Sequence, residues 1–346
     1  MSHPIRFAII GSGGIAAKHA LAISAVPDAK LVAVWGRMPE QGHLFAASHD
    51  AEFMPDILAL AERNDIDAVT IATPSGAHAK SAVPFLKKGK AVLCEKPLEI
   101  TLEKIDAILH AAQENNALLA GVLQLRLGGG ARALKRAVTE GRFGNLALCS
   151  AYLKWWREQE YYDSVGWRGT WALDGGGALM NQGVHAADLL QWLVGMPAKV
   201  FAFAGLRGHR DIEVEDTVSA TLQYPNGAMG VIEASTACRP GFGMRIEISG
   251  DKGSAVLQDD KIIEWKFDEE APEDEKIRTS ESQGIVGGSG DPRAIGFEGH
   301  KILIEDLCNA IRCKQAPMIP GSEARNAVQL ILAIYQSARE GRMVSL

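Results

Sequence analysis

The 346-residue sequence lacks the marks of several common protein classes. Its five cysteines are an odd number without a C-x-x-C pair, so they are read as reduced thiols rather than as a disulfide framework or a zinc site. The basic residues are scattered and the net charge is −6, which argues against nucleic acid as a partner. No apolar run approaches the roughly 18 residues of a membrane-spanning helix, and no signal-peptide pattern follows Met1. We therefore expect a cytoplasmic protein with no membrane partner.

The composition that is present is typical of a soluble globular protein. Apolar residues make up 47% of the chain and charged residues 23%. Since a domain has roughly 150 residues, this length predicts two domains.

The first third of the chain alternates short apolar runs with amphipathic stretches. This alternation is typical of β-α-β units around a parallel sheet. Strands are predicted at 6–10, 30–35, 68–72 and 91–94, and helices at 15–25 and 102–115. We expect a Rossmann-type, doubly wound α/β domain over residues 1–124.

After residue 124 neighbouring strands follow one another without intervening helices. Helices are predicted at 131–140 and 177–193, an extended segment at 146–156, strands at 200–204, 217–224, 228–235, 245–249 and 254–258, and late helices at 297–312 and 322–341. This order predicts an α+β domain over residues 125–346 with an open, mainly antiparallel sheet, whose last helix either stays with it or packs back on the first domain. The acidic stretch 268–292 is expected to be a surface excursion.

One face of this second sheet is expected to need cover. Apolar residues alternate along its strands: Val218, Ala220, Leu222, Val231, Ile246 and Ile248. The sequence therefore predicts a homodimer or homotetramer that forms through the C-terminal sheet.

A glycine-rich turn joins the first predicted strand to the first helix. It reads Gly11-Ser12-Gly13-Gly14-Ile15-Ala16, a G-x-G-x-x-A pattern. Gly11 permits the tight turn, Gly13 permits close approach of a pyrophosphate, and a helix N-terminus favours an anion. Dinucleotide binding is the favoured interpretation, and a simple tight turn is the alternative.

The end of the second strand bears on the choice of cofactor. An acidic residue there binds the adenosine ribose and repels a 2′-phosphate, but this segment reads Val34-Trp35-Gly36-Arg37. Arg37 could pair with a 2′-phosphate, so NADP is favoured over NAD. The alternative is a solvated arginine at a loop tip.

Four stretches together resemble the Gfo/Idh/MocA oxidoreductase family, which includes glucose-fructose oxidoreductase and inositol dehydrogenase. They are the glycine turn, the loop from Ala72 through Thr73 and Pro74 to His78, the segment Cys94-Glu95-Lys96-Pro97-Leu98, and Gly175-Gly176-Gly177 followed by Asn181, His185 and Asp188. The resemblance covers nearly the whole chain. It implies a dinucleotide-binding domain, a C-terminal domain with an open antiparallel sheet, and hydride transfer to or from a carbinol carbon of a sugar or cyclitol.

The resemblance also implies roles for individual residues. Lys96 and His185 match the family's lysine and histidine that reach the substrate. Thr73, Pro74, His78, Glu95 and Lys96 itself match segments beside the cofactor. At the position four residues before the histidine the family often has aspartate. Here it is Asn181, which cannot carry a proton, so a carboxylate relay through this position is in doubt.

The residues themselves fit this chemistry. Oxidation of an alcohol needs a base for the hydroxyl proton and a donor for the developing oxyanion, and His185 and Lys96 offer both. On a helix, Asn181 and Asp188 would lie near the face of His185, where Asp188 could orient the imidazole or meet substrate. A solvated lysine and a structural histidine are the alternative interpretation, and a turn-stabilising role is an equal alternative for His78.

An aromatic loop is the most distinctive segment of the chain. Rings and polar groups gather within 17 residues at Trp155, Trp156, Arg157, Tyr161, Tyr162, Trp167, Arg168 and Trp171. Such a mixture suits a sugar, whose C–H face stacks on rings while its hydroxyls meet arginine and tyrosine, and we count Trp155, Arg157, Tyr161, Trp167, Arg168 and Trp171 as substrate residues. A domain-interface cluster is the alternative. The histidines and cysteines form no ligand-spaced cluster, so no metal is predicted.

The sequence therefore predicts an NAD(P)-dependent dehydrogenase or reductase that acts on a sugar or polyol. Two alternatives stay open: an enzyme that uses transient NAD-dependent oxidation to cleave a glycoside, and a non-enzymatic sugar or redox sensor on the same fold. The particular sugar, the oxidised carbon and the direction cannot be read from these residues.

Overall fold

The computed structural model describes residues 3–280 and 296–346 and divides the chain into two compact units. Unit 1 comprises Met1–Leu123 and Gly296–Arg325, and unit 2 comprises Gln124–Ile295 and Asn326–Leu346. In the part of the chain that is described, no helix is long and apolar enough to cross a membrane.

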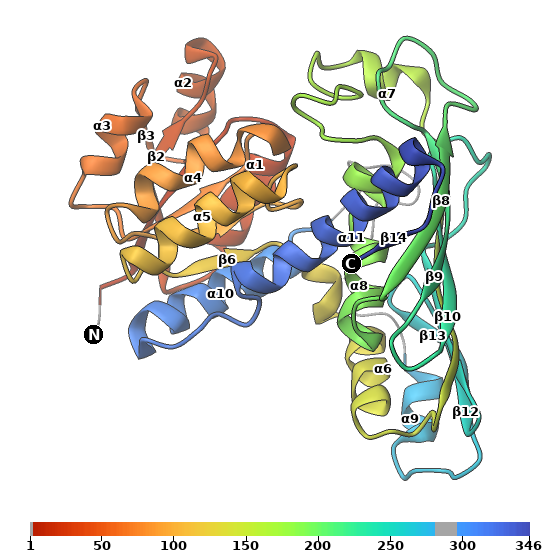
Figure 1. The fold of residues 1–346 in the computed structure, drawn as a ribbon. Coiled ribbons are helices and arrows are strands. Elements are labelled where there is room, and N and C mark those ends of the chain that lie inside the picture. Colours follow the sequence, from red (N-terminus) through yellow and green to blue (C-terminus); the bar gives the residue numbers. More distant parts are fainter. Residues whose placement is uncertain (1–2, 281–295) are drawn as a thin grey trace. The chain divides into compact units, whose positions relative to one another are not determined.

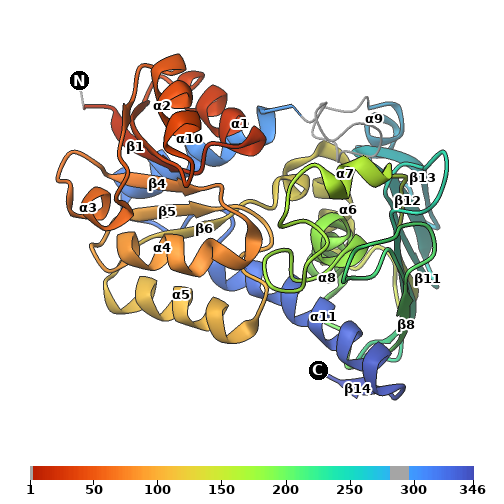
Figure 2. The same cartoon turned by 90° about the horizontal axis from the view of Figure 1, so that it is seen from above.

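Unit 1 is built around a six-stranded sheet in which every neighbouring pair is parallel. Its order is β3 (Glu52–Phe53), β2 (Ala29–Trp35), β1 (Ile5–Ile10), β4 (Ala68–Ile71), β5 (Ala91–Cys94) and β6 (Leu119–Gly121). The helical segments are α1 (Gly14–Ser24), α2 (Pro39–Ser48), α3 (Ile57–Glu62), η1 (Ser75–Ala77), α4 (His78–Leu86), α5 (Leu102–Glu114) and α10 (Glu298–Cys313). Figure 2 shows α4 and α5 on one face of the sheet and α1 and α10 on the other. Because both faces are covered, β4 and β5 are continuously apolar apart from Thr70 and wholly buried.

Unit 1 contains helix α10, which the sequence analysis assigned to the second domain. The predicted boundary put all residues after 124 in the second domain, but residues 296–325 cluster with unit 1. The reason is that the buried face of α10 packs against α1, β2 and β5. Helix α11 (Gly321–Glu340) begins in unit 1 and continues into unit 2.

Unit 2 contains an eight-stranded, mainly antiparallel sheet among the described residues. Its order is β13 (Lys261–Phe267), β12 (Gly253–Gln258), β11 (Arg245–Gly250), β7 (Leu146–Lys154), β10 (Met229–Ser235), β9 (Thr217–Gln223), β8 (Lys199–Gly205) and β14 (Val344–Ser345). Only the pairing of β7 with β10 is parallel within that sheet. The helical segments are η2 (Gln124–Leu127), α6 (Gly129–Thr139), α7 (Gln159–Asp163), the π-helix η3 (Ala178–Gln182), α8 (Val184–Val194) and α9 (Asp274–Thr279). The predicted fold class is therefore confirmed for both units.

The helices of unit 2 cover the sheet face that the sequence marks as needing cover. Five of the six alternating apolar residues are buried, namely Val218, Ala220, Leu222, Ile246 and Ile248. Helix α8 packs on β7 and β11, α6 on β12 and β13, and η3 on β9 and β10. Figure 1 shows α6 and α8 on the same face of the sheet. The prediction that a second subunit covers these residues is therefore wrong, because helices of the same chain cover them. The opposite face bears Leu148, Phe203 and Met229, which are 54%, 71% and 56% exposed.

Two local predictions also differ from the structure. The helix expected over 177–193 is two elements, a π-helix and α8, which meet at Gly183. The acidic stretch 268–292 contains the short helix α9, which the lack of periodicity did not predict. The remainder of that stretch, from residue 281, lies outside the described residues.

Candidate active site

The turn between β1 and α1 leaves its backbone open for a ligand. Gly11 has a φ of 131°, and a Cβ there would lie 2.5 Å from the carbonyl oxygen of Ala72. A Cβ at Gly13 or Gly14 would meet nothing within 4 Å. Helix α1 starts at Gly14, and its N-cap residue Gly13 has no side chain to occupy the first amide groups. The free amides and the open space fit a pyrophosphate.

Arg37 lies at the carboxyl end of β2, beside this turn. A Cβ on the preceding Gly36 would come within 2.7 Å of the Ser12 hydroxyl oxygen, so the two segments are in close contact. The Arg37 side chain is exposed, and so is Glu40 on the helix that follows. In the glycine turn, Ser12 and Ile15 are half-buried. A guanidinium, not a carboxylate, thus directly follows the glycine at the end of this strand.

His78 ties together the two loops that follow β4 and β5. Its Nδ1 lies 2.9 Å from the Pro97 carbonyl oxygen and its Nε2 lies 2.9 Å from that of Thr73. The ring is 1% exposed, and burial lowers the pKa of His78, so it is neutral and donates to one of these two acceptors. Thr73 and Pro74 lie in the loop that follows β4. Oγ1 of Thr73 lies 3.3 Å from Oγ of Ser81, which is on α4. These contacts favour the turn-stabilising interpretation of His78.

Glu95 and Lys96 follow β5, the strand next to β4. The Glu95 carboxylate is buried and receives hydrogen bonds from His19 and His300, so it points into unit 1. Lys96 is half-buried, and its backbone N–H donates to the second Glu95 oxygen at 3.2 Å. The carboxyl ends of parallel strands are where this class of sheet binds ligands, which places Lys96 at the expected edge.

In unit 2 the predicted substrate residues form a polar network beside the π-helix. The Arg157 guanidinium donates to Gln182 Oε1 at 3.1 Å, and Gln182 Nε2 donates to the Tyr161 hydroxyl at 2.6 Å. The Arg168 guanidinium lies 4.2 Å from the centre of the Tyr161 ring. The structure therefore brings Arg157, Tyr161 and Arg168 together, with Gln182 as a member that the sequence did not predict.

The three predicted tryptophans have different surroundings. Trp155 is 2% exposed, and its ring lies under the Arg157 guanidinium at 5.0 Å, as a core residue would. Trp167 lies 5.5 Å from the Arg168 guanidinium, and Trp171 is 42% exposed with its ring edge-on to Tyr335. Of these three rings, Trp167 is half-buried and Trp171 is exposed, so both are accessible to a ligand within unit 2.

Asn181 belongs to the same network through an aspartate. Its side-chain Nδ2 donates to Asp174 Oδ1 at 2.5 Å, and the other Asp174 oxygen accepts from the Gly169 amide at 2.9 Å. Asp174 is 1% exposed. An aspartate at position 181 would put two carboxylates in contact, which explains why asparagine suits this chain.

The glycine run before Asn181 accommodates a buried carboxylate. Glu215 accepts hydrogen bonds from the amides of Gly177 and Leu179, both at 2.9 Å, and from the Tyr335 hydroxyl at 2.8 Å. A Cβ on Gly177 would lie 1.8 Å from the Glu215 carbonyl oxygen, so no other residue fits there. Burial raises the pKa of Glu215 to about 7. Glu215 holds the start of the π-helix, and only its position in space, not a sequence motif, identifies it.

His185 and Asp188 lie on α8, directly after the π-helix. His185 is 7% exposed. Asp188 is 2% exposed and forms a bidentate ion pair with Arg126, at 2.8 and 2.7 Å, and it also accepts from Gln191. This buried pairing favours a structural role for Asp188, which anchors α8 to η2, over the predicted contact with substrate.

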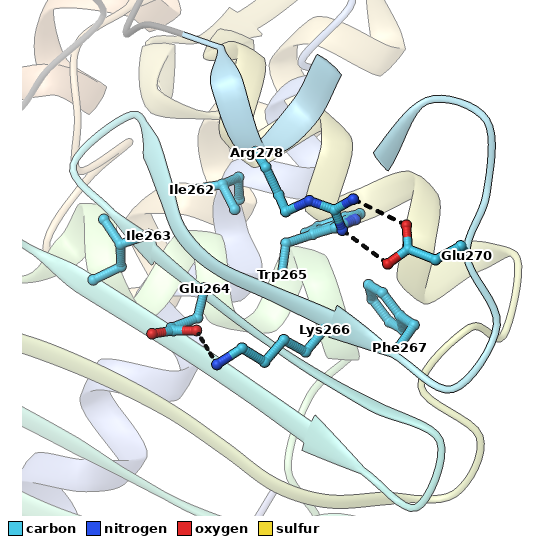
Figure 3. A pocket seen from close by; sticks show the side chains of 8 residues that line it. All are labelled: Ile262, Ile263, Glu264, Trp265, Lys266, Phe267, Glu270 and Arg278. Carbon is cyan, nitrogen blue, oxygen red and sulfur yellow. Dashed lines mark hydrogen bonds and ion pairs between the residues drawn. The ribbon is translucent and has the colours of Figure 1, made fainter. Parts of the chain in front are cut away.

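The candidate residues are thus distributed over both units. The glycine turn, Arg37, the 73–78 loop and Lys96 belong to unit 1, whereas His185 and the polar network belong to unit 2. A surface pocket of about 400 Å³ lies elsewhere in unit 2, between β13 and α9, where Arg278 pairs with Glu270 (Figure 3). Its lining contains none of the predicted site residues.

Comparison with known proteins identifies both parts of the chain. Residues 5–122 match the family model described as an oxidoreductase family with an NAD-binding Rossmann fold, and residues 131–256 match the GFO/IDH/MocA C-terminal domain. Inositol 2-dehydrogenase of Rhizobium meliloti is 29% identical over 75% of this chain and 77% of its own length. D-glucoside 3-dehydrogenase of Escherichia coli is 27% identical over 100% of this chain and 98% of its own.

Solved structures of WlbA dehydrogenases are similar along the full chain. The enzyme of Chromobacterium violaceum is 32% identical with a TM-score of 0.90, covering 100% of this chain and 97% of that one. The enzyme of Bordetella pertussis is 33% identical with a TM-score of 0.89, covering 99% of each chain. Both were solved in complex with NADH and UDP-GlcNAcA. The match of both family models and this likeness over the full length confirm the resemblance, and the chain belongs to the Gfo/Idh/MocA family of oxidoreductases, as a dehydrogenase with an NAD-binding Rossmann unit.

Proposed function

We propose that this dehydrogenase transfers hydride reversibly between a nicotinamide dinucleotide and a carbinol or keto carbon of a sugar, cyclitol or sugar derivative. The observation that carries the proposal is the similarity to an inositol dehydrogenase over 75% of this chain and to a D-glucoside dehydrogenase and a WlbA dehydrogenase over 100% of it. The sequence motifs that contain Lys96 and His185 support the proposal. The open glycine turn supports the dinucleotide part of the proposal.

We propose a nucleotide-linked sugar acid as the first substrate class to test. The support is that the two WlbA complexes contain UDP-GlcNAcA and exceed 30% identity to this chain. In addition, Arg157 and Arg168 bring two guanidinium groups to Tyr161, and such a cluster suits an anionic, hydroxylated ligand.

The proposed proton chemistry uses His185 and Lys96. His185 takes the hydroxyl proton during oxidation, and Lys96 donates a hydrogen bond to the same or an adjacent oxygen as negative charge develops there. When bound, the nicotinamide accepts the hydride or returns it. The Asn181 side chain has no titratable proton and takes no part in proton transfer. Its amide, oriented by Asp174, forms a hydrogen bond with a substrate hydroxyl.

Single-turnover hydride transfer tests these roles. Because general acid-base catalysis contributes about a hundredfold or more, His185→Ala should slow the transfer at least this much, with nearly unchanged cofactor affinity. Lys96→Ala should cost at least as much in the rate of transfer. The exposed His110→Ala and Lys87→Ala serve as matched controls and should transfer at the parent rate. If His185→Ala keeps the parent rate from about pH 6 to about pH 9, the base lies elsewhere, and Tyr161 becomes the next candidate.

The substrate panel also separates the alternative functions. UDP-GlcNAcA, free monosaccharides, inositols and glycosides are each offered with NAD and with NADP, and NAD(P)H absorbance is followed. Turnover of a glycoside without net NAD(P)H formation would instead support cleavage by transient oxidation. Sugar binding without turnover of any of these compounds would support a sensor.

We propose that Arg37 admits NADP in addition to the NAD for which the family model is described. An exposed guanidinium beside the glycine turn can pair with a 2′-phosphate, whose contribution as a charge-assisted hydrogen bond is about 1.5 to 3 kcal/mol. Arg37→Ala should weaken NADP binding by that amount and leave NAD binding nearly unchanged. Equal losses for both cofactors would contradict this role.

We also propose that unit 2 forms a homo-oligomer through its sheet. The exposed apolar residues Leu148, Phe203 and Met229, on the face opposite α6 and α8, support this proposal. Sedimentation of the protein at micromolar concentration as a 37.1 kDa monomer would contradict it.

A further inference from the structure

Three buried side chains from distant parts of the chain meet immediately before Lys96. His19 lies on α1, Glu95 follows β5, and His300 lies on α10. The Nε2 atoms of His19 and His300 are 3.0 and 2.8 Å from the same Glu95 oxygen, Oε1. Their side chains are between 0% and 7% exposed, and the two rings meet edge to face. This cluster is buried inside unit 1, and nothing in the proposed proton chemistry uses it.

The hydrogen bonds fix the charge of the cluster. Burial alone would raise the pKa of Glu95, but the hydrogen bonds from His19 and His300 hold it well below its ordinary value, so Glu95 is ionised. Burial lowers the pKa of His19. Among residues 3–280 and 296–346, the Nδ1 atoms of both rings have no hydrogen-bond partner, so a proton added there would be a buried donor without an acceptor. Each ring therefore donates through Nε2 to the ionised Glu95 carboxylate.

A metal ion is the competing occupant. Two imidazoles and one carboxylate are metal-ligand types, and their ligand atoms lie within 4.8 Å of one another. A metal would bind through Nε2 and move each ring proton to Nδ1, where ligating histidines normally donate to an acceptor. Neither Nδ1 has one here. The short Nε2 to Oε1 distances are also those of hydrogen bonds.

The cluster connects α1 and α10 to the segment that follows β5. Glu95 Oε2 accepts the backbone N–H of Lys96 at 3.2 Å, while Oε1 is held from α1 and from α10. Helix α1 begins at the glycine turn, so His19 links that turn to the segment that bears Lys96. The Glu95 backbone N–H is separately fixed to the Ile71 carbonyl of β4 at 3.1 Å.

We propose that His19, Glu95 and His300 are positioning residues, which clamp the Lys96 backbone to α1 and α10 through one carboxylate and two imidazole donors. The proposal rests on the proposed role of Lys96, because only then does its placement affect the reaction. The clamp itself is independent of that role and can be measured without turnover.

Hydrogen exchange of the Lys96 amide measures the clamp directly. His300→Leu removes one of the two donors, so Glu95 is held from α1 alone. The Lys96 amide should then exchange at least about tenfold faster, the factor that corresponds to one hydrogen bond to a charged group. His300→Gln retains an N–H donor and should restore most of the protection. The Val92 amide, bonded to the Leu118 carbonyl at 2.8 Å, is the internal reference. Leu303→Ala, which truncates a buried residue of the same helix, should leave the Lys96 amide protected.

Two further measurements complete the test. Histidine ¹⁵N chemical shifts of the cofactor-free protein at neutral pH should show both rings as Nε2–H tautomers, whereas a shift of Nε2 on addition of zinc would establish a metal site and overturn the clamp.

In single-turnover hydride transfer, His300→Leu should slow the rate about tenfold at saturating substrate, with cofactor affinity unchanged and with rescue by His300→Gln. Unchanged Lys96 amide exchange in His300→Leu, or an equal effect of Leu303→Ala, would overturn the proposal. If the parent enzyme reduces or oxidises no compound of the panel, the proposed function fails, and the exchange rates and tautomers decide the clamp alone.

Discussion

The ion pair of Arg126 and Asp188 offers the sharpest test of a structural against a substrate-binding role. The two side chains are 4% and 2% exposed, and two short hydrogen bonds join them. Removing one partner of a buried pair leaves an uncompensated charge and costs about 3 to 5 kcal/mol. Asp188→Leu and Arg126→Met should each lower the free energy of unfolding of unit 2 by this amount. The double variant should recover most of the loss, because it leaves no buried charge.

The assay is urea unfolding followed by tryptophan fluorescence. Six of the seven tryptophans lie in unit 2, so the signal reports this unit even when the two units unfold separately. The exposed pair Lys154–Glu233 is the control, with side chains 41% and 35% exposed, and Lys154→Met should cost less than about 1 kcal/mol. In thermal unfolding the buried variants should lose roughly 6 to 20 °C.

The substrate-binding interpretation predicts the opposite pattern. Asp188→Asn would then raise KM while unfolding stayed within about 1 kcal/mol of the parent. That result, or a double variant no more stable than the single variants, would refute the structural reasoning.

Two other regions give predictions. Gly13→Ala should raise the NADH dissociation constant about tenfold or more without altering stability, because the added Cβ meets only the open space where a pyrophosphate would approach. Gly11→Ala should also cost about 1 to 3 kcal/mol of stability, since its φ is 131° and the Ala72 carbonyl is too close. NADH fluorescence titration and thermal unfolding check both, and unimpaired binding by Gly13→Ala would contradict the first. Glu215 has a pKa of about 7 in the fold against an ordinary 4.5, so the folded state binds more protons between these values. Stability should therefore fall by up to about 3 kcal/mol as pH rises through this window, and urea unfolding of Glu215→Gln should show a flatter pH dependence.

Local patterns in the sequence predict much of unit 1 and the motifs within it. The glycine turn is recognisable because Gly11 and Gly13 act through their own backbone, next to a strand and a helix of ordinary periodicity. The partners of the motif residues are not recognisable, since contacts such as His300 to Glu95 join residues 205 positions apart. Spacing along the chain carries no information about such a pair.

In unit 2 the alternation of apolar residues predicts the strands but not what covers them. Val218 and Ile246 alternate in the same way whether a helix of the same chain or a second copy packs on them. Asp188 illustrates a similar limit, because its position three residues after His185 suggested a shared ligand whereas its partner is Arg126 on η2. The π-helix at Asn181 depends on Glu215, which follows it by more than thirty residues.

The order in which the chain visits its two units has a consequence for engineering. Residues 124–295 form an insertion within the dinucleotide-binding unit, since the chain returns to that unit for residues 296–325 before it leaves again along α11. A fragment that ends at residue 123 would lack α10, and with it His300 and the cover of α1. A chimera intended to exchange substrate preference should therefore replace the insertion together with residues 326–346, whose β14 pairs with β8, and keep 296–325 from the recipient.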